Sequence, residues 1–179
     1  MFEETRKKLG FFLTRLLFRR KRQQPISFSN VFSSAQTAMV IVPDNPEYRT
    51  VVMPILTLLQ GKFQGTKLTL VVNETFRNLA TSFVRSTVVT IRDEHLNFLF
   101  LPRRSEINRL LIQKFDVVVD LNFKNVPSAA YLVRGANAPV KVGFVKEHAD
   151  AYYNFQFNAG QNRNVRSRYE QLFRTLSMF

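Results

Sequence analysis

The sequence predicts an α/β fold with a single doubly wound parallel sheet. Short runs of β-branched and other apolar residues alternate with segments of helical periodicity, which is the pattern of repeated strand–helix–strand units. The clearest unit begins at the almost continuous apolar run 115–121, which has the composition of a strand buried on both faces. A helix-compatible segment (127–134) and a second apolar run (140–145) follow it. Right-handed crossovers then predict the strand order 3-2-1-4-5.

A basic amphipathic helix is expected to precede this domain. Residues 1–24 contain eight Lys and Arg against two Glu, a net charge of +6. At 100° per residue, six apolar side chains share one broad face, namely Phe2, Leu9, Phe12, Leu13, Leu16 and Leu17. Phe11 and Phe18 fall on the opposite side, among the basic residues.

This helix has three candidate roles. A basic helix with Phe and Leu on one face suits an anionic membrane interface, with the six apolar side chains and Arg15, Arg19, Arg20, Lys21 and Arg22 as the contacts. It could also pack on its own domain or on a partner protein, or bind nucleic acid. Arg15 interrupts the apolar stretch, so the pattern is not that of a cleaved signal peptide.

The remaining elements are expected in a regular order. Residues 25–36 are polar and predict a linker, and residues 37–179 form the domain. Further strands are expected at 37–42, 67–72 and 87–91, an extended piece at 152–157, and helices at 47–63 (with a kink or late start at Pro54), 75–83, 105–114 (with Ser105 as N-cap) and 164–178. Residues 95–101 fit either a strand or a loop.

Composition narrows the range of partners. The net charge of +13 favours anionic partners, which include membrane surfaces, nucleic acids and phosphorylated ligands. The chain has no Cys, which excludes disulfides and cysteine metal sites and is compatible with a reducing compartment. No apolar run reaches the ~18 residues that a spanning helix needs.

The motifs of common cofactor and catalytic sites are absent from the sequence. It contains neither GxGxxG nor GxxxxGK[ST], so that no phosphate-cradling loop and no cofactor is expected. His95 and His148 are the two histidines, and no cluster has the spacing of metal ligands. No GxSxG sequence marks a nucleophilic serine.

A ligand site is nevertheless expected beyond the carboxyl ends of the strands, between the first and fourth strands. The residues that this rule selects are Asn45, Tyr48 and Arg49 after the first strand, Asn122, Lys124 and Asn125 after the fourth, and Lys146 and His148 after the fifth. Asp44 and Glu47 are the candidate general bases there. The alternative interpretation is that Asp44 and Asn45 form a turn and cap a helix, and that the lysines only solvate the surface.

Five stretches resemble one family of enzymes. FDVVVDLN (115–122) is similar to the "YDLVIDL" strand of the heptosyltransferase-like glycosyltransferases, which act on lipopolysaccharide with ADP-heptose. SAAYL (128–132) and KVGF (141–144) resemble that family's "RSALLARL…RIGF", and VVMPIL (51–56) resembles its "LLTTPVLRAL" helix. The helix 164–176 resembles the one that closes the family's N-terminal domain.

This resemblance implies a Rossmann-like domain corresponding to the acceptor-side half of a GT-B type enzyme. The family's second Rossmann-like domain binds the donor, and this chain ends where that domain would begin. The family also carries a Gly-Asp pair before the helix proline, with the Asp as proposed base. Counting back from Pro54, those positions hold Glu47 and Tyr48.

The leading hypothesis is a glycosyltransferase-like domain that is non-catalytic on its own. It would be cytoplasmic and peripheral to the inner membrane, and would bind a glycolipid-type acceptor or an envelope protein partner. One alternative is an active transferase half assembled with a partner chain or as a homodimer. The other is a basic nucleic-acid-binding module, for which the sequence offers no groove-reading helix or RNA-binding signature.

Overall fold

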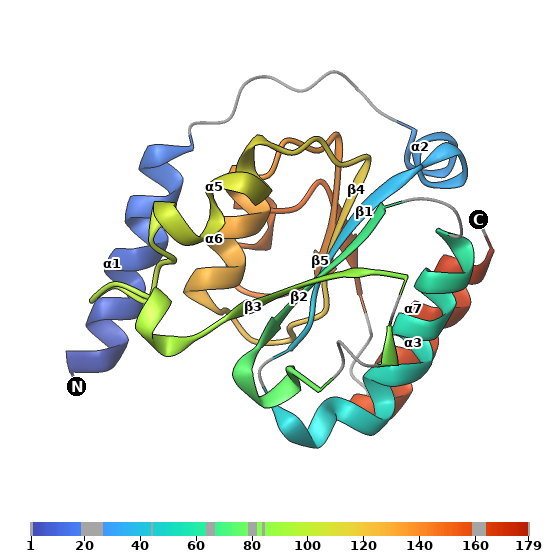
Figure 1. Ribbon diagram of the computed structural model, residues 1–179, viewed down its shortest axis with the longest axis horizontal. Helices are drawn as coiled ribbons and strands as arrows, with labels where there is room; N and C mark the ends of the chain where they lie inside the picture. Colours follow the sequence, from blue (N-terminus) through green and yellow to red (C-terminus); the bar gives the residue numbers. More distant parts are fainter. Residues whose placement is uncertain are drawn as a thin grey trace.

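The described residues build a six-stranded, all-parallel sheet at the centre of the fold (Figure 1). The computed structural model describes residues 2–18, 27–43, 45–63, 67–78, 82–83, 85–158 and 164–178. The strands are β1 (Thr37–Ile41), β2 (Lys67–Asn73), β3 (Thr87–Ile91), β4 (Val117–Asp120), β5 (Val140–Phe144) and β6 (Phe155–Phe157). Their order is β3-β2-β1-β4-β5-β6. The predicted order 3-2-1-4-5 is therefore confirmed, and β6 extends the sheet beside β5.

β1 and β4 form the middle of the sheet because their residues are apolar on both faces. All four residues of β4 and the last four of β1 are buried, as expected for parallel strands covered by helices on both sides. Ile41 pairs with Asp120 across the two strands. The carboxyl ends of β1 and β4 therefore lie next to each other, where the chain order of the sheet reverses.

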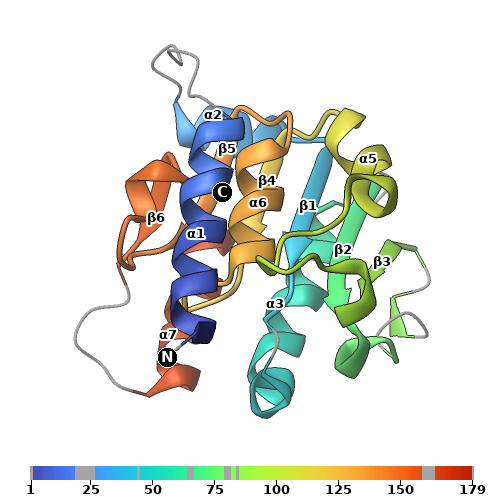
Figure 2. The same cartoon turned by 90° about the vertical axis from the view of Figure 1, so that its left-hand side faces the viewer.

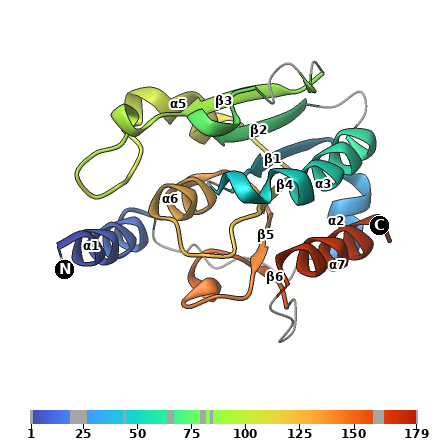
Figure 3. The same ribbon diagram turned by 90° about the horizontal axis from the view of Figure 1, so that it is seen from below.

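Helices cover both faces of the sheet (Figure 3). One face carries α2 (Phe28–Ser34), α3 (Arg49–Lys62) and α7 (Val165–Ser177), and α3 packs along α7. The other face carries α5 (Arg104–Ile112) and α6 (Pro127–Gly135), with α1 (Phe2–Leu17) packed on the outer side of α6 (Figure 2). Short 3-10 turns follow the carboxyl ends of four strands, namely η1 (Pro46–Tyr48), η2 (Glu74–Phe76), η3 (Asp93–His95) and η4 (Ala149–Ala151).

The segment expected to be a linker contains a short helix instead. In α2, Phe32 is completely buried in the core on the face of the sheet that α3 and α7 cover, and its ring meets Phe63 edge to face. Phe28 stacks on Phe155 of β6, with ring centroids 3.9 Å apart. Residues 25–36 are mostly polar, so the sequence did not indicate these two aromatic contacts. They attach the segment to the domain.

Several element boundaries also differ from the prediction. The helix expected at 47–63 begins with η1 and continues as α3, which runs through Pro54. α5 begins earlier than expected, so that Arg103 and not Ser105 occupies the N-cap position. Of the helix expected at 75–83, the structure describes η2 at its start. Of residues 95–101, His95 ends η3, and the others form a turn that is closed by an isolated antiparallel bridge between Leu96 and Pro102.

α1 packs on the domain through the side opposite to its predicted apolar face. Gly10 and Thr14 are buried, and a Cβ added at Gly10 would lie 2.5 Å from the carbonyl oxygen of Leu99, so only glycine allows this close approach. Phe11 meets Tyr152 edge to face, and Phe18 meets the ring of Tyr131 in the same way. The two phenylalanines that disturbed the amphipathic pattern are therefore the residues that attach the helix.

Candidate functional site

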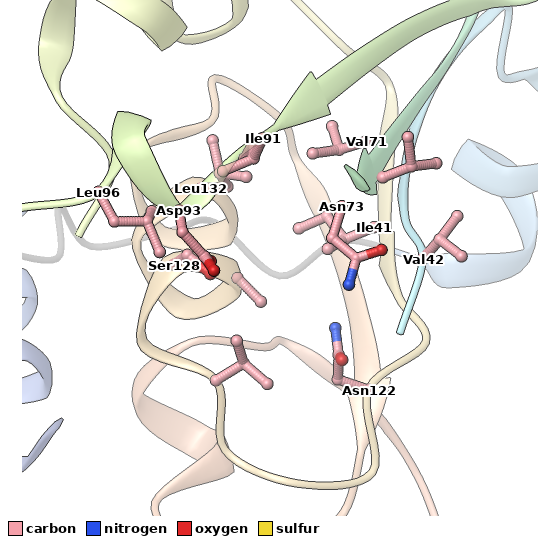
Figure 4. A pocket seen from close by; sticks show the side chains of 13 residues that line it. Ile41, Val42, Val71, Asn73, Ile91, Asp93, Leu96, Asn122, Ser128 and Leu132 are labelled. Atoms are coloured by element: carbon pink, nitrogen blue, oxygen red, sulfur yellow. The ribbon is translucent and has the colours of Figure 1, made fainter. Parts of the chain in front are cut away.

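A pocket lies at the carboxyl ends of β1, β2, β3 and β4, where the strand order reverses (Figure 4). Its volume is about 140 Å³. Most of the lining residues are apolar, but polar atoms supply the larger part of the pocket surface. Figure 4 shows Asn73 and Asn122 on one side of the pocket and Asp93 and Ser128 on the other. The remaining lining residues are Ile41, Val42, Val71, Val72, Ile91, Leu96, Val126, Ala129 and Leu132.

The pocket can hold a small polar group, but it is too small for a nucleotide sugar. Typical ligand pockets have volumes of ~300–1,000 Å³. Ser128 belongs to the first turn of α6, whose N-cap residue Val126 has no side chain that can accept from the free backbone N–H groups. Among the described residues, no group of three His, Asp or Glu side chains is placed to hold a metal ion.

Beside the pocket, the carboxylate of Asp120 organises a buried polar cluster. Asp120 ends β4, and its side chain is fully buried. One carboxylate oxygen accepts hydrogen bonds from the backbone and side-chain nitrogens of Asn122, at 2.9 and 2.7 Å. The other accepts from Lys146 Nζ at 3.0 Å and from the hydroxyl of Tyr153. The cluster thus connects β4, the loop after β5 and Tyr153, which lies two residues before β6.

The electrostatics of this cluster are balanced. The side chain of Lys146 is 7% exposed, and its Nζ also donates to the carbonyl oxygens of Asn122 (2.9 Å) and Lys124 (3.3 Å). Burial raises the pKa of the Tyr153 phenol well above its ordinary value, and the neighbouring Asp120 carboxylate raises it further. Tyr153 is therefore a neutral donor, and all of these groups have partners. The arrangement holds two loops together and leaves Asp120 engaged on both oxygens.

The residues predicted to bind a ligand do not lie together in the structure. Asn122 lines the pocket, and Lys146 belongs to the Asp120 cluster. Lys124 is exposed. Asn125 donates to the carbonyl oxygen of Glu147 at 3.1 Å, and the exposed His148 has a left-handed backbone conformation with φ of 58°.

The residues predicted after β1 lie around the start of α3. Asn45 accepts a hydrogen bond from the backbone N–H of Glu47 at 3.0 Å and so caps η1. Tyr48 packs edge to face against Phe123, with ring centroids 6.0 Å apart. Glu47 and Arg49 are exposed, and Asp44 lies outside the described residues. The capping role offered as the alternative for this turn is confirmed for Asn45.

Sequence reasoning missed Asn73, Asp93, Ser128 and the pair Asp120–Tyr153. Asn73 and Asp120 each end a strand, so the rule that selected Asn122 also applies to them. The pairing of Tyr153 with Asp120 had no signal in the sequence, because the two residues are 33 positions apart.

One comparison with known proteins places the chain in a family. A family model matches residues 10–179, almost the whole chain, and it describes DUF6913, a family of unknown function. The chain belongs to DUF6913. No curated protein and no solved structure matches it.

The most unusual surface of the DUF6913 chain is the outer side of α1. Five of the six side chains on the predicted apolar face are exposed: Phe2 (86%), Phe12 (61%), Leu16 (51%), Leu9 (49%) and Leu17 (46%). We call these five residues the α1 apolar row. Leu13 and Arg15 are half-buried, and residues 19–22 lie outside the described part of the chain. No described helix is long and apolar enough to cross a membrane.

A loop extends this surface beyond α1. The guanidinium of Arg6 lies 4.0 Å from the ring centroid of Phe98, and its Nε donates to the Phe98 carbonyl oxygen at 2.8 Å. The Phe98 ring remains 69% exposed beside the helix. Phe98 was not among the predicted contacts, because it is adjacent to α1 only in the folded chain.

Proposed function

We propose that this protein is a membrane-peripheral binding domain that docks on anionic lipid through the α1 apolar row. The observation that carries the proposal is the division of α1 into two sides. Gly10, Thr14, Phe11 and Phe18 fix one side to the domain, and the row presents five large apolar side chains to the outside. A helix packed only for stability would bury its larger apolar side chains and expose the smaller polar ones.

Charge favours an anionic lipid surface over a neutral partner. Residues 1–24 carry a net charge of +6, and the whole chain carries +13. Basic residues near an anionic membrane contribute about 1 kcal/mol each, and apolar side chains inserted at the interface add to this. Phe98 supplies a further aromatic contact next to the row.

The finer assignment is a glycosyltransferase-like domain that is not catalytic on its own. It would lie on the cytoplasmic face of the inner membrane and bind a glycolipid-type acceptor or an envelope protein. Support comes from the resemblance of five stretches, and from a pocket of about 140 Å³ at the carboxyl ends of the strands that has no room for a sugar nucleotide. The buried carboxylate beside the pocket is engaged by Lys146, Tyr153 and Asn122, so it is not free to act as a base. Sugar transfer from an ADP-sugar by the purified chain would refute the non-catalytic assignment.

Co-sedimentation with vesicles tests the docking. The full chain is mixed with neutral phosphatidylcholine vesicles and with vesicles containing phosphatidylglycerol, and the double variant Phe12→Ser/Leu16→Ser is compared with it. We expect the variant to bind anionic vesicles at least about tenfold more weakly, because two inserted side chains contribute about 2 kcal/mol together.

The matched control is the double variant Ile112→Ser/Met178→Ser. These residues are 72% and 78% exposed, lie on α5 and at the end of α7, and do not belong to the α1 apolar row. The control should bind like the unchanged chain, and circular dichroism should show that all three proteins are folded. Equal binding by both double variants, or no preference for anionic vesicles, would rule out docking through the row.

A further inference from the structure

A second cavity lies between α1 and the loop that follows β5. Its volume is about 430 Å³, within the range of ~300–1,000 Å³ typical of small-molecule sites. α1 contributes one wall, from Glu4 to Arg15, and the opposite wall contains Asn125, His148 and Tyr152. These α1 positions share one flank of the helix, whereas the α1 apolar row occupies another. The cavity is therefore separate from the proposed membrane contact, and the inference drawn from it does not depend on docking.

The lining of this cavity carries three cations, Lys7, Lys8 and Arg15, and two carboxylates, Glu4 and Glu147. Lys7 Nζ lies 2.7 Å from the carboxylate of Glu3 and 3.5 Å from that of Glu4, so its charge is matched. Lys8, which is exposed, and Arg15, which is half-buried, both line the cavity. Neither Lys8 nor Arg15 forms an ion pair with a carboxylate of the described residues. The second lining carboxylate, Glu147, lies 3.5 Å from Nε2 of His148. Lys8 and Arg15 therefore remain available to a bound anion.

The guanidinium of Arg15 is left with an unused donor. Its Nε is buried and has no hydrogen-bond partner among the described residues. An unsatisfied buried donor costs about 1–3 kcal/mol, and such donors are rare in native proteins. Because Arg15 also lines the cavity, this cost points to a role for its side chain there.

A neutral hydroxyl lies beside the guanidinium. Burial raises the pKa of Tyr152, while the positive charges of Arg15 and Arg134 oppose that rise. The phenol therefore keeps its proton at neutral pH. Its hydroxyl donates only over 3.4 Å, to the carbonyl oxygen of Phe11. The hydroxyl of Tyr152 can therefore rotate and donate a stronger hydrogen bond to a bound acceptor.

The opposite wall of the cavity is held in a strained conformation. His148 has φ of 58°, a left-handed conformation that is costly for a residue with a Cβ. Asn125 donates from Nδ2 to the carbonyl oxygen of Glu147 at 3.1 Å and keeps this segment in place. Strain of this kind concentrates at functional sites, where the surrounding structure maintains it.

We propose that this cavity binds a phosphate monoester, with Arg15 as the principal contact and Lys8 and Tyr152 as further donors. The planar guanidinium offers parallel N–H donors that match phosphate oxygens, and charge-assisted hydrogen bonds are stronger than neutral ones. The phosphate can belong to a soluble metabolite or to a lipid headgroup such as that of phosphatidic acid. Both sources present the same chemistry to the cavity.

Two probes separate these sources when applied to the full chain. Glycerol 3-phosphate is titrated by calorimetry, and co-sedimentation compares vesicles of phosphatidic acid with phosphatidylglycerol vesicles of matched surface charge. Arg15→Gln should weaken binding of the recognised probe by at least about tenfold, since a hydrogen bond to a charged group contributes ~1.5–3 kcal/mol. Lys8→Gln should weaken it by about two- to fivefold, as expected for an exposed charge. Arg103→Gln removes an exposed charge at the start of α5 and should change nothing.

The outcomes are distinct. Arg15-dependent binding of glycerol 3-phosphate supports a soluble ligand, and an Arg15-dependent preference for phosphatidic acid vesicles alone supports a lipid headgroup. Binding of both probes that is equal in Arg15→Gln and Arg103→Gln would overturn the proposal. If Arg15→Gln does not fold, unchanged binding by Lys8→Gln would do the same. Phe12→Ser/Leu16→Ser should leave the affinity for glycerol 3-phosphate unaltered, so a failure of membrane docking is recognised separately.

Discussion

Replacing Asp120 by Asn should destabilise the protein strongly, although the two side chains have nearly the same shape. The carboxylate is fully buried and accepts four hydrogen bonds, two from Asn122 and one each from Lys146 and Tyr153. An amide has one oxygen, so two of these donors would face an NH₂ group. The ammonium of Lys146 would also remain buried without a counter-charge. Breaking a buried ion pair in this way costs about 3–5 kcal/mol.

Urea unfolding followed by circular dichroism at neutral pH measures this loss. With a slope of ~2 kcal/mol per molar urea, the midpoint of Asp120→Asn should fall by about 1.5–2.5 M while the slope stays unchanged. Asp150→Asn provides the control, because Asp150 is exposed on η4 and its replacement should stay within ~0.5 kcal/mol. The double variant Asp120→Asn/Lys146→Met should lose less stability than the sum of the losses of the two single variants.

A loss below about 1 kcal/mol for Asp120→Asn would refute the role of Asp120 as a buried counter-charge, because such a loss is no larger than that of one ordinary hydrogen bond. Additive losses in the double variant would show that Asp120 and Lys146 do not stabilise each other.

Further predictions concern packing and pH. Gly143→Ala should cost about 1–3 kcal/mol, because its Cβ would lie 2.5 Å from the Tyr153 ring, whereas Gly61→Ala in α3, with open space around it, should stabilise by ~0.4–1 kcal/mol in the same urea assay. Phe32→Ala should cost about 3–5 kcal/mol, since the ring is fully buried, and a loss near zero in thermal unfolding would show that α2 is not anchored. Burial tends to raise the pKa of Asp116, but hydrogen bonds from backbone and side-chain donors outweigh this and lower it. The carboxylate therefore contributes stability that is complete above its unfolded pKa of about 4 and is lost as the pH falls through the lower folded pKa. Asp116→Asn should flatten this acid limb in unfolding curves measured from pH 5 to pH 2, and an unchanged limb would contradict the assignment.

The sheet was largely predictable because its determinants are local. Apolar runs such as 115–121 and 140–145 identify central strands by composition alone, and the handedness of crossovers supplies their order. α2 was missed because its two anchoring rings stand in a polar segment and act only through contacts with Phe63 and Phe155.

The site was less predictable, because it depends on pairings between distant residues. The rule for carboxyl ends of strands selected Asn122, which lines the pocket. It also selected Lys146, but its partner Asp120 was counted as part of a strand, and Tyr153 carried no signal. On α1, five of the six residues that periodicity placed on one apolar face are exposed in the structure, and Leu13 packs against the domain. Periodicity could not show that Phe11 and Phe18, the exceptions to the pattern, would decide which side of the helix meets the domain.

The position of β3 has a consequence for solubility. β3 forms one edge of the sheet, and its sequence TVVTI contains no charge and no proline. An uncharged, β-branched edge strand is a template on which a second chain can add a strand. Charged residues flank it closely, with Arg85 before it and Arg92 directly after it. Charged residues at such positions oppose strand addition, so neutralising both should increase aggregation as the protein concentration rises.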